Sequence, residues 1–321
     1  MAERDPELAR DALKGLRDYE AAERRPRPAP MPEVARVRGA CLRNHAGTGA
    51  PAVLIPSLIN PPRVLDLDEQ VSLTGAVARM GRRALLLDWG AAKHRAQLDV
   101  AGHIEDLLVP LLRSIGEPVA LVGYCLGGTM AIAAANLIQV ERLVTLGAPW
   151  NFALYPGSSR AALQDMWRHS EPASRELGAL PMEVLQASFW SLDPQRTVRK
   201  FAEFGKIDPA SAEAERFIAL EDWANEGEPL PYPAAKELID ALFSRDFSGS
   251  GQWQVGGHVV TDELSVPLLN LTAEHDRIAP AATAARGETV AISSGHVGMI
   301  VGSARGQLHD AMRRFLDPAC R

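Results

Sequence analysis

Short apolar runs alternate with helical patterns over the first half of the chain. Runs of three or four mostly apolar residues, each suited to one buried strand, occur at residues 53–55, 84–87, 119–122 and 143–146. Residues 100–115 lie between two of these runs and show the spacing of a helix. Alternation of buried strands with helices is typical of βαβ units and a parallel sheet. Residues 31–150 are therefore predicted to form the first part of an α/β core.

The pattern changes after residue 150. Residues 151–262 carry helical and loop signals and many aromatic residues, which we expect mostly to fill the core of a helical cap rather than to contact substrate. Two further apolar runs, residues 266–273 and 289–292, predict strands within a second part of the core, residues 263–321. Residues 1–30 are expected to form an exposed N-terminal helical arm, ended by the proline-rich residues 25–30.

One seven-residue motif, Gly-Tyr-Cys-Leu-Gly-Gly-Thr at residues 123–129, follows the strand predicted at residues 119–123. A helix is predicted directly after it, over residues 129–138. A strand, a tight glycine turn and a helix form a nucleophile elbow, in which the nucleophile needs small neighbours. Here the nucleophile is Cys125 where most such motifs have serine. A phosphate loop is disfavoured because the motif lacks the lysine that reaches a phosphate.

Two further strand ends supply an acid and a histidine in the order that α/β-hydrolases use. Asp276 follows the strand predicted over residues 266–273, and His296 follows the strand predicted over residues 289–292. The carboxyl ends of parallel strands meet at one edge of the sheet, where the active sites of open α/β sheets lie. Cys125, Asp276 and His296 are therefore predicted to form a catalytic triad.

A cysteine nucleophile reacts as its thiolate, so Cys125 needs a base, which we assign to His296. Asp276 would orient the imidazole and stabilise its cationic form. The backbone N–H of Leu126 is predicted as the first donor of an oxyanion hole, and that of Ile59, in the loop after the strand at residues 52–55, as the second.

Other chemical candidates are weaker. His275 neighbours Asp276, but adjacent side chains on an extended segment point to opposite faces. Asp88 ends a strand near the same edge, and capping of its loop outweighs a catalytic role. His103 and His309 fall in predicted helices and are expected to be surface or packing residues. The other two cysteines, Cys41 and Cys320, are expected to be structural or incidental.

Composition narrows the class of protein. The 321 residues are 46% hydrophobic, which is enough for a sizeable core. The net charge of −6 argues against a nucleic-acid binder, which needs a basic face. Three scattered cysteines suggest neither a disulfide framework nor a metal site, and no cofactor is expected. Residues 1–25 are charged rather than apolar, and no apolar run approaches a membrane span, so a cytoplasmic location is expected.

Several segments, in order, resemble the polyhydroxyalkanoate synthases, particularly their shorter catalytic subunits. One family segment is similar to residues 51–67, where Ile59, Asn60, Asp66 and Leu67 match. The next family segment is similar to residues 83–90, which end in Asp-Trp-Gly. Residues 123–129 match the family's G-x-C-x-G-G-T box. Residues 143–152, 221–223, 256–257, the segment around Asp276 and Gly295-His296 continue the match. The family usually has histidine after the aspartate, whereas this chain has Arg277, and its connection from Asp276 to His296 is short.

The resemblance implies an α/β-hydrolase fold, a mostly parallel sheet with helices on both faces and an inserted helical cap. It implies the catalytic roles of Cys125, Asp276 and His296, and it places Trp223 near the substrate. The activity implied is polymerisation of (R)-3-hydroxyacyl-CoA through a Cys-bound thioester, with a helper subunit or a homodimer as partner and a polymer granule surface as a compatible location. The alternative is a cysteine-dependent esterase, thioesterase or intracellular polyester depolymerase.

Overall fold

The computed structural model describes residues 5–317, and these residues fall into two compact units. The larger unit comprises residues 31–182 and 228–317, and the smaller comprises residues 5–30 and 183–227. The boundaries of these two units differ from the boundaries of the four segments expected from the sequence. The four-part division stays a prediction.

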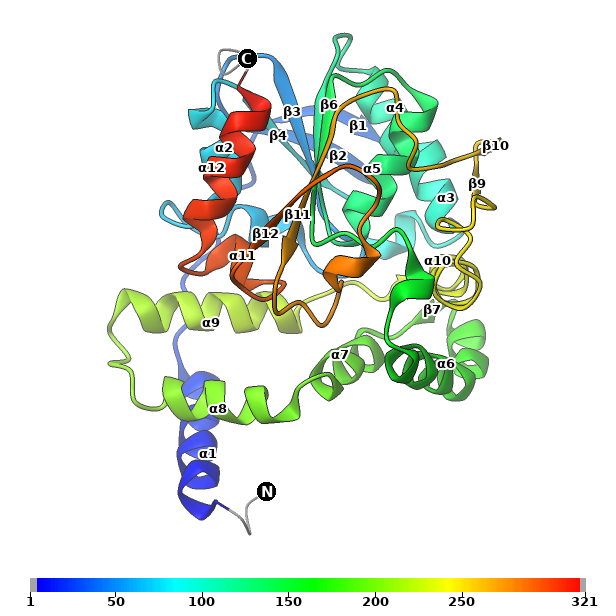
Figure 1. Cartoon of the computed structure of the whole chain (residues 1–321). Helices are drawn as coiled ribbons and strands as arrows, with labels where there is room; N and C mark the ends of the chain where they lie inside the picture. The colour runs from blue at the N-terminus through cyan, green and yellow to red at the C-terminus, as the bar shows by residue number, and fades with distance from the viewer. Residues whose placement is uncertain (1–4, 318–321) are drawn as a thin grey trace. The chain divides into compact units, whose positions relative to one another are not determined.

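An eight-stranded sheet forms the centre of the larger unit (Figure 1). Its strand order is β1-β2-β4-β3-β5-β6-β11-β12. The six strands β4, β3, β5, β6, β11 and β12 run parallel, whereas β2 is antiparallel to both of its neighbours, β1 and β4. The strands are β1 (Glu33–Val37), β2 (Ala40–Ala46), β3 (Pro51–Ile55), β4 (Arg83–Asp88), β5 (Ala120–Tyr124), β6 (Arg142–Leu146), β11 (Leu268–Ala273) and β12 (Glu288–Ile292).

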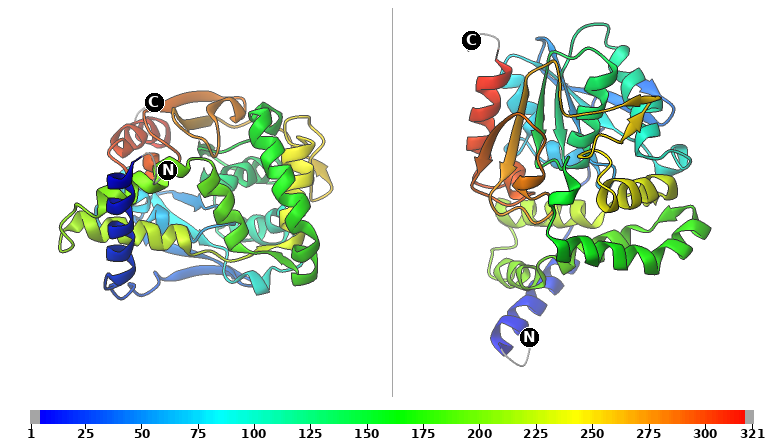
Figure 2. Two further views of the ribbon diagram at one scale, coloured as in Figure 1. Left: turned by 90° about the horizontal axis from the view of Figure 1, so that it is seen from below. Right: turned by 45° about the vertical axis from the view of Figure 1, so that its right-hand side comes forward.

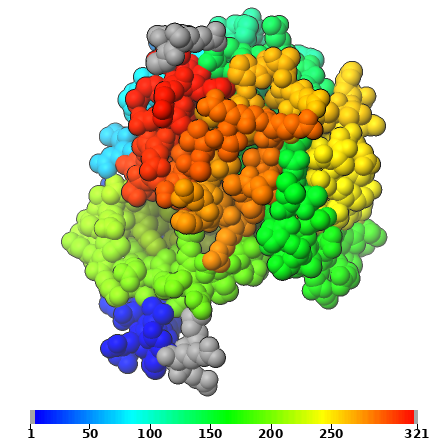
Figure 3. All heavy atoms as spheres, in the orientation of Figure 1, coloured from blue at the N-terminus to red at the C-terminus, as the bar shows by residue number. Residues whose placement is uncertain are grey.

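Each predicted strand is confirmed to within two residues, because β3, β5, β6 and β11 are buried along their whole length and so appear as continuous apolar runs. The hairpin of β1 and β2 was not predicted. Its strands are only partly buried, and β1 alternates polar and apolar residues without a strong signal. The edge strand β12 is largely exposed, and its segment reaches the surface in the orange region of Figure 3.

Helices cover both faces of this sheet (Figure 1), as the sequence predicted. Helices α2 and α12 pack together on one face, and α5 packs with the helical segment of residues 100–113 on the other. The bounds are α2 (Leu73–Arg79), α3 (Val100–His103), the π-helical η3 (Ile104–Leu108), α4 (Val109–Arg113), α5 (Leu126–Leu137), α11 (Gly298–Val301) and α12 (Arg305–Leu316).

The remaining longer helices and the short strands of the larger unit follow β6. They are the 21-residue helix α6 (Gly157–Leu177), α10 (Tyr232–Lys236), the π-helical η5 (Glu237–Ser244) and two small antiparallel sheets of two strands each. One sheet pairs β7 (Ala179–Leu180) with β8 (Leu230–Pro231), and the other pairs β9 (Gln254–Val255) with β10 (His258–Val259). Single turns of 3₁₀-helix are η1 (Pro62–Leu65), η2 (Ala92–His94), η4 (Phe152–Leu154) and η6 (Ala281–Thr283).

The smaller unit is helical and contains α1 (Pro6–Ala21), α7 (Met182–Ser191), α8 (Pro194–Phe204) and α9 (Ala212–Asn225). The sequence predicted an exposed N-terminal arm, but α1 packs against α8 (Figure 2). Gly15 permits this close approach, because a Cβ there would lie 1.8 Å from the Phe201 carbonyl oxygen. Tyr19 packs with Phe204 and donates a 2.7 Å hydrogen bond to Asp222. Such a pairing across more than 180 residues leaves no local sequence signal.

Candidate active site

Cys125 lies at the sharp turn between β5 and α5. Its φ of 54° and ψ of −130° are a conformation that residues other than glycine rarely adopt, as a nucleophile elbow requires. Its N–H donates to the Leu146 carbonyl at 2.9 Å, which ties the turn to the neighbouring strand β6. The side chain is neither fully buried nor fully exposed.

The glycines of the motif are explained by close backbone contacts. A Cβ at Gly123 would lie 2.4 Å from the Gly128 Cα, and a Cβ at Gly128 would lie 2.4 Å from the Ala148 Cβ. At Gly127 it would lie 2.2 Å from the Ile55 carbonyl oxygen. Since real Cβ atoms do not approach so closely, larger residues would push α5 away from β3 and β5 and would move the turn that carries Cys125.

Asp276 and His296 form a buried pair. The Asp276 Oδ2 lies 2.6 Å from the His296 Nδ1, and both residues are 7% exposed. The backbone N–H groups of Ile278 and Ala279 each donate to the Asp276 Oδ1 at 2.8 Å, so the carboxylate is fixed by its own loop. Because Nδ1 bonds to Asp276, the other ring nitrogen of His296, Nε2, is left for the nucleophile.

The structure brings Cys125 into interaction with this pair. Burial lowers the pKa of His296, but the charge of Cys125 and the hydrogen bonds that His296 makes with Asp276 and Cys125 outweigh burial and raise that pKa to about 10. His296 therefore holds its proton at neutral pH, as the cationic partner of a thiolate would. The arrangement can generate an imidazolium and thiolate pair in a site that is mostly closed to water.

Three further residues line this site and were not predicted from the sequence. The Tyr124 ring stacks on the His296 ring with centroids 5.0 Å apart. The Tyr155 hydroxyl donates to the Ile278 carbonyl at 2.8 Å, in the loop that follows Asp276. A Cβ at Gly147, where φ is +52°, would lie 3.0 Å from the His296 Nδ1. No local pattern marks these contacts, because each joins segments more than 100 residues apart.

Both tyrosines show how apolar the site is. Burial raises the pKa of Tyr124 and of Tyr155 well above the ordinary value, and the charges of Cys125 and Asp276 add to the shift. The phenols therefore stay neutral at any physiological pH. A dry and weakly polarisable wall strengthens electrostatic interactions between the charged groups that it encloses.

The two predicted oxyanion donors lie on adjoining segments. Leu126 is the first residue of α5, so its N–H has no carbonyl partner within the helix. The Ile59 N–H contacts the Ser57 hydroxyl at 3.3 Å, a long hydrogen bond that a substrate oxygen could replace. Ile59 belongs to the loop after β3, which begins at Pro56. The Pro56 carbonyl packs on Gly127 in the first turn of α5. Their roles in an oxyanion hole stay predictions.

The weaker candidates have other environments. His275 is exposed, whereas its neighbour Asp276 is buried. Asp88 caps its own loop by accepting the Gly90 N–H at 2.9 Å. His103 is fully buried, and burial lowers its pKa to about 4. Cys41 is buried, and Cys320 lies outside the described residues. Trp223 lies on α9 of the smaller unit, and its contact with substrate stays a prediction.

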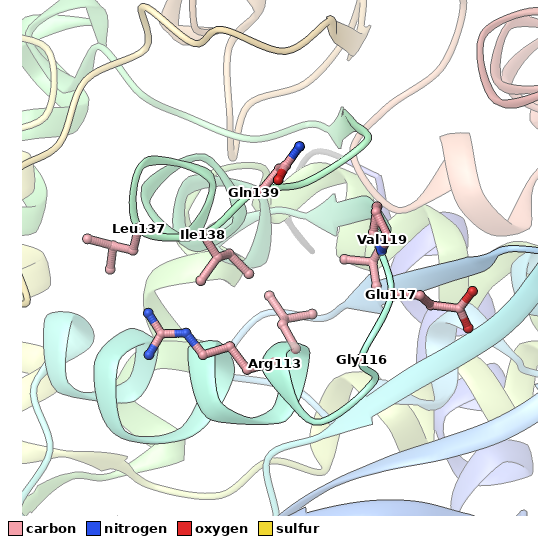
Figure 4. Close-up of a pocket in the computed structure, with 9 residues that line it drawn as sticks. Arg113, Gly116, Glu117, Val119, Leu137, Ile138 and Gln139 are labelled. Atoms are coloured by element: carbon pink, nitrogen blue, oxygen red, sulfur yellow. The ribbon is translucent and has the colours of Figure 1, made fainter.

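Two hollows of the larger unit lie elsewhere. One, of about 400 Å³, lies at the amino end of β5, opposite the end that carries Cys125, and is lined by Val119, Leu137 and Ile138 among others (Figure 4). The other is lined by Arg36, Arg38 and Arg43, and each of these arginines is paired with a carboxylate. Within residues 5–317, no group of three or more histidine, cysteine or acidic side chains is arranged to hold a metal ion. The helices described there include none long and apolar enough to cross a membrane.

Comparison with solved structures identifies the fold. The chain superposes with a TM-score of 0.52 and 15% identity on CumD, a meta-cleavage product hydrolase from Pseudomonas fluorescens, over 90% of this chain and 98% of that one. For BpoC from Mycobacterium tuberculosis the TM-score is 0.56 at 15% identity, over 88% and 96% of the two chains. With the strand order described above, these likenesses show an α/β-hydrolase fold.

Comparison with curated sequences identifies the relatives, although no family model matches the chain. The chain is 27% identical over 295 residues to the poly(3-hydroxyalkanoate) polymerase subunit PhaC of Synechocystis sp., covering 83% of this chain and 77% of that protein. It is 25% identical over 287 residues to the PhaC subunit of Allochromatium vinosum, covering 83% and 80%. Of the PhaC subunit of Haloarcula marismortui, at 24% identity, the chain spans only 58%.

These relatives confirm the resemblance that the sequence motifs indicated, and they support an enzyme of the synthase or hydrolase type. The chain is thus a distant relative of the polyhydroxyalkanoate polymerase subunits, built on the α/β-hydrolase fold.

Proposed function

We propose that the protein is an acyltransferase that polymerises (R)-3-hydroxyacyl groups from coenzyme A through a thioester on Cys125. The observation that carries the proposal is a cysteine at a nucleophile elbow whose partner, His296, is held by a buried Asp276 and has its pKa raised to about 10. Two curated proteins that this chain matches by sequence are named as poly(3-hydroxyalkanoate) polymerase subunits, which supports the proposal.

In the first step, the Cys125 thiolate attacks the thioester carbonyl carbon of the acyl-CoA. The new carbon–sulfur bond forms, the bond to the coenzyme A sulfur breaks, and His296 gives its proton to the departing thiolate. The oxyanion that forms between these events would accept hydrogen bonds from the Leu126 and Ile59 N–H groups. Asp276 keeps the imidazole in the tautomer that presents Nε2 to the sulfur.

In the second step, the hydroxyl of a second hydroxyacyl group attacks the acyl-cysteine. His296 takes the hydroxyl proton, the ester bond forms, and Cys125 leaves as a thiolate that restores the ion pair. Exchange of one thioester for another conserves the activation of the acyl group until this second attack. A cysteine therefore suits a synthase, because the energy of the thioester is retained for ester formation.

Water would compete with the hydroxyl in the second step. The buried phenols of Tyr124 and Tyr155 beside the pair support exclusion of water from the acyl-cysteine. The proposal includes a growing polyester as product, with Trp223 as a substrate contact. It also includes a helper subunit or a second copy of the chain as partner, and a cytoplasmic location compatible with a polymer granule surface.

The experiment that tests this proposal compares two products from 3-hydroxybutyryl-CoA. Released coenzyme A is measured with a thiol reagent, and free acid and ester-linked oligomers are separated by chromatography, with and without added candidate partner subunits. We expect oligomer to account for most of the coenzyme A released. Free 3-hydroxybutyrate in a one-to-one ratio with coenzyme A under every partner condition would reject polymerisation and favour the cysteine-dependent hydrolase.

A further inference from the structure

The loop after β3, residues 56–60, is held by a tryptophan from the neighbouring strand end. The indole N–H of Trp89, which follows β4, donates to the Pro56 carbonyl at 3.1 Å. Trp89 is 4% exposed, and Pro56 is buried, so no bulk water can replace this donor. The loop begins at Pro56 and continues to Ile59, whose N–H is the second predicted oxyanion donor.

The same carbonyl also packs against the first turn of α5. A Cβ at Gly127 would lie 2.5 Å from the Pro56 carbonyl oxygen, which means that the loop and the helix are in backbone contact there. Leu126, which offers the first oxyanion donor, directly precedes Gly127. The Pro56 carbonyl therefore contacts both Gly127 and the indole of Trp89, so the Trp89 hydrogen bond holds the loop where it meets the turn that carries the first donor.

Trp89 is itself fixed by a buried pair. The Trp89 and His103 rings form a T-shaped pair, with their centroids 5.9 Å apart and their planes at 80°. The His103 Nδ1 bonds to the Asp99 carbonyl at 2.6 Å, and its Nε2 lies 3.2 Å from an Nη of Arg95. The Arg95 Nε also donates to the Gly90 carbonyl at 3.4 Å, one residue after Trp89. Arg95 and His103 are 3% and 0% exposed, so this support is rigid and dry.

We infer that Trp89 is a positioning residue for the oxyanion hole: its indole N–H sets the place of the Ile59 N–H relative to the Leu126 N–H. The inference rests on the proposed acyl transfer at Cys125. Trp89 is not a member of the Cys125, Asp276 and His296 triad, and its indole N–H acts through the backbone of one loop.

A positioning role predicts different effects on acylation and on alkylation of Cys125, whereas a merely structural role predicts the same effect on both. Acylation of Cys125 passes through a tetrahedral oxyanion, whereas alkylation of the same thiolate by iodoacetamide forms no oxyanion. Loss of the Trp89 N–H should therefore slow acylation and leave alkylation unchanged. Damage to the Cys125 and His296 pair would slow both reactions, because both need the thiolate.

The test uses the full chain with Trp89→Phe, and a second variant in which Trp89 is replaced by benzothienylalanine, which keeps the bicyclic shape without the N–H. Trp253→Phe is the matched control, since Trp253 is also buried and its indole N–H also donates to an acceptor, the partly buried Glu237 carboxylate, at 2.7 Å. Single-turnover acylation is measured with 3-hydroxybutyryl-CoA and with a p-nitrophenyl ester, and alkylation with iodoacetamide.

We expect both Trp89 variants to lose about tenfold or more in the acylation rate with either substrate, because loss of one oxyanion donor costs about 10²- to 10³-fold and displacement costs part of that. Their alkylation rates should stay within about twofold of the wild type, as should both rates for Trp253→Phe. Equal loss of acylation and alkylation, or unchanged acylation in the benzothienylalanine variant, would overturn the inference.

The ester substrate separates this inference from the proposed function. If the wild type is acylated by the p-nitrophenyl ester but not by the acyl-CoA, the proposed function fails, and the effect of Trp89 is still measured with the ester. If neither substrate acylates Cys125 in the wild type, both the proposed function and the positioning role are rejected.

Discussion

Replacement of Asp276 by asparagine should remove the charge that supports His296 while leaving the fold in place. Asparagine is nearly the same size, and its Oδ1 can still accept the two 2.8 Å bonds from the Ile278 and Ala279 N–H groups. Its Nδ2, however, would face the His296 Nδ1 where the carboxylate Oδ2 now lies at 2.6 Å. A donor in this place favours the tautomer that carries its proton on Nε2, which cannot accept the proton of Cys125.

The size of the effect follows from what is lost. A charge-assisted hydrogen bond is worth about 1.5–3 kcal/mol, so the free energy of unfolding should fall by that amount. The loss in kcat/KM should be larger, about 10³- to 10⁴-fold, because the wrong tautomer affects each turnover and each factor of ten corresponds to about 1.4 kcal/mol of barrier. The pKa of His296 should also fall from about 10, because the hydrogen bond to Asp276 is among the interactions that raise it.

The assay is the rate of coenzyme A release from 3-hydroxybutyryl-CoA, together with thermal unfolding of the same preparation. Asp262→Asn is a suitable control, because the Asp262 carboxylate is also buried but is held by Arg286, whose backbone N–H donates to it at 2.8 Å, and not by a catalytic histidine. That variant should keep its activity within about twofold. A folded Asp276→Asn protein with activity within tenfold of the wild type would refute the orienting role of Asp276.

Three further predictions follow from the site and its surroundings. His296→Ala should slow alkylation of Cys125 at neutral pH, and the alkylation rate should rise with pH as it does for an ordinary thiol, whose pKa is about 8.5. The wild type should stay reactive through neutral pH, because the pKa of His296 is raised to about 10 and its imidazolium persists. Identical pH profiles for the two proteins would exclude the ion pair. Gly147→Ala should lower the free energy of unfolding by about 1–2 kcal/mol, since φ is +52° at this position. It should also lower activity, because the new Cβ would lie 3.0 Å from the His296 Nδ1 and would displace the imidazole. Full activity in the folded variant would contradict that packing. The pKa of His103 is about 4 in the folded protein, below its unfolded value of about 6.5, so the unfolded chain binds the proton first as the pH falls. Stability should therefore fall as pH drops from about 6.5 to 4, and the Tm of His103→Gln should fall less steeply over this window. An unchanged slope of Tm against pH would contradict the lowered pKa of His103.

The sequence was sufficient to predict the parts of the fold that local patterns encode. Buried parallel strands appear as apolar runs, so β3, β4, β5, β6 and β11 were found, and the glycines around Cys125 marked the elbow. The order of Cys125, Asp276 and His296 along the chain placed them at strand ends, and the structure brings the three together.

Other features depend on contacts between distant segments, and no local pattern encodes them. The hairpin of β1 and β2 is half exposed, so its hydrophobic signal is weak. The packing of α1 on α8 is set by a glycine contact across more than 180 residues. The Asp-Trp-Gly segment was recognised as a motif, but its hydrogen bond from Trp89 to Pro56 depends on the sheet placing β4 beside β3.

Detection of an acyl group on Cys125 tests the central claim most directly. The protein is mixed with 3-hydroxybutyryl-CoA, quenched in acid and analysed by intact mass spectrometry and peptide mapping, alongside Cys125→Ala. We predict a hydroxybutyryl adduct on the peptide that contains Cys125, formed as coenzyme A is released, and neither adduct nor release in folded Cys125→Ala. Release of coenzyme A by the Cys125→Ala protein at the wild-type rate, or an adduct on another residue, would contradict the account.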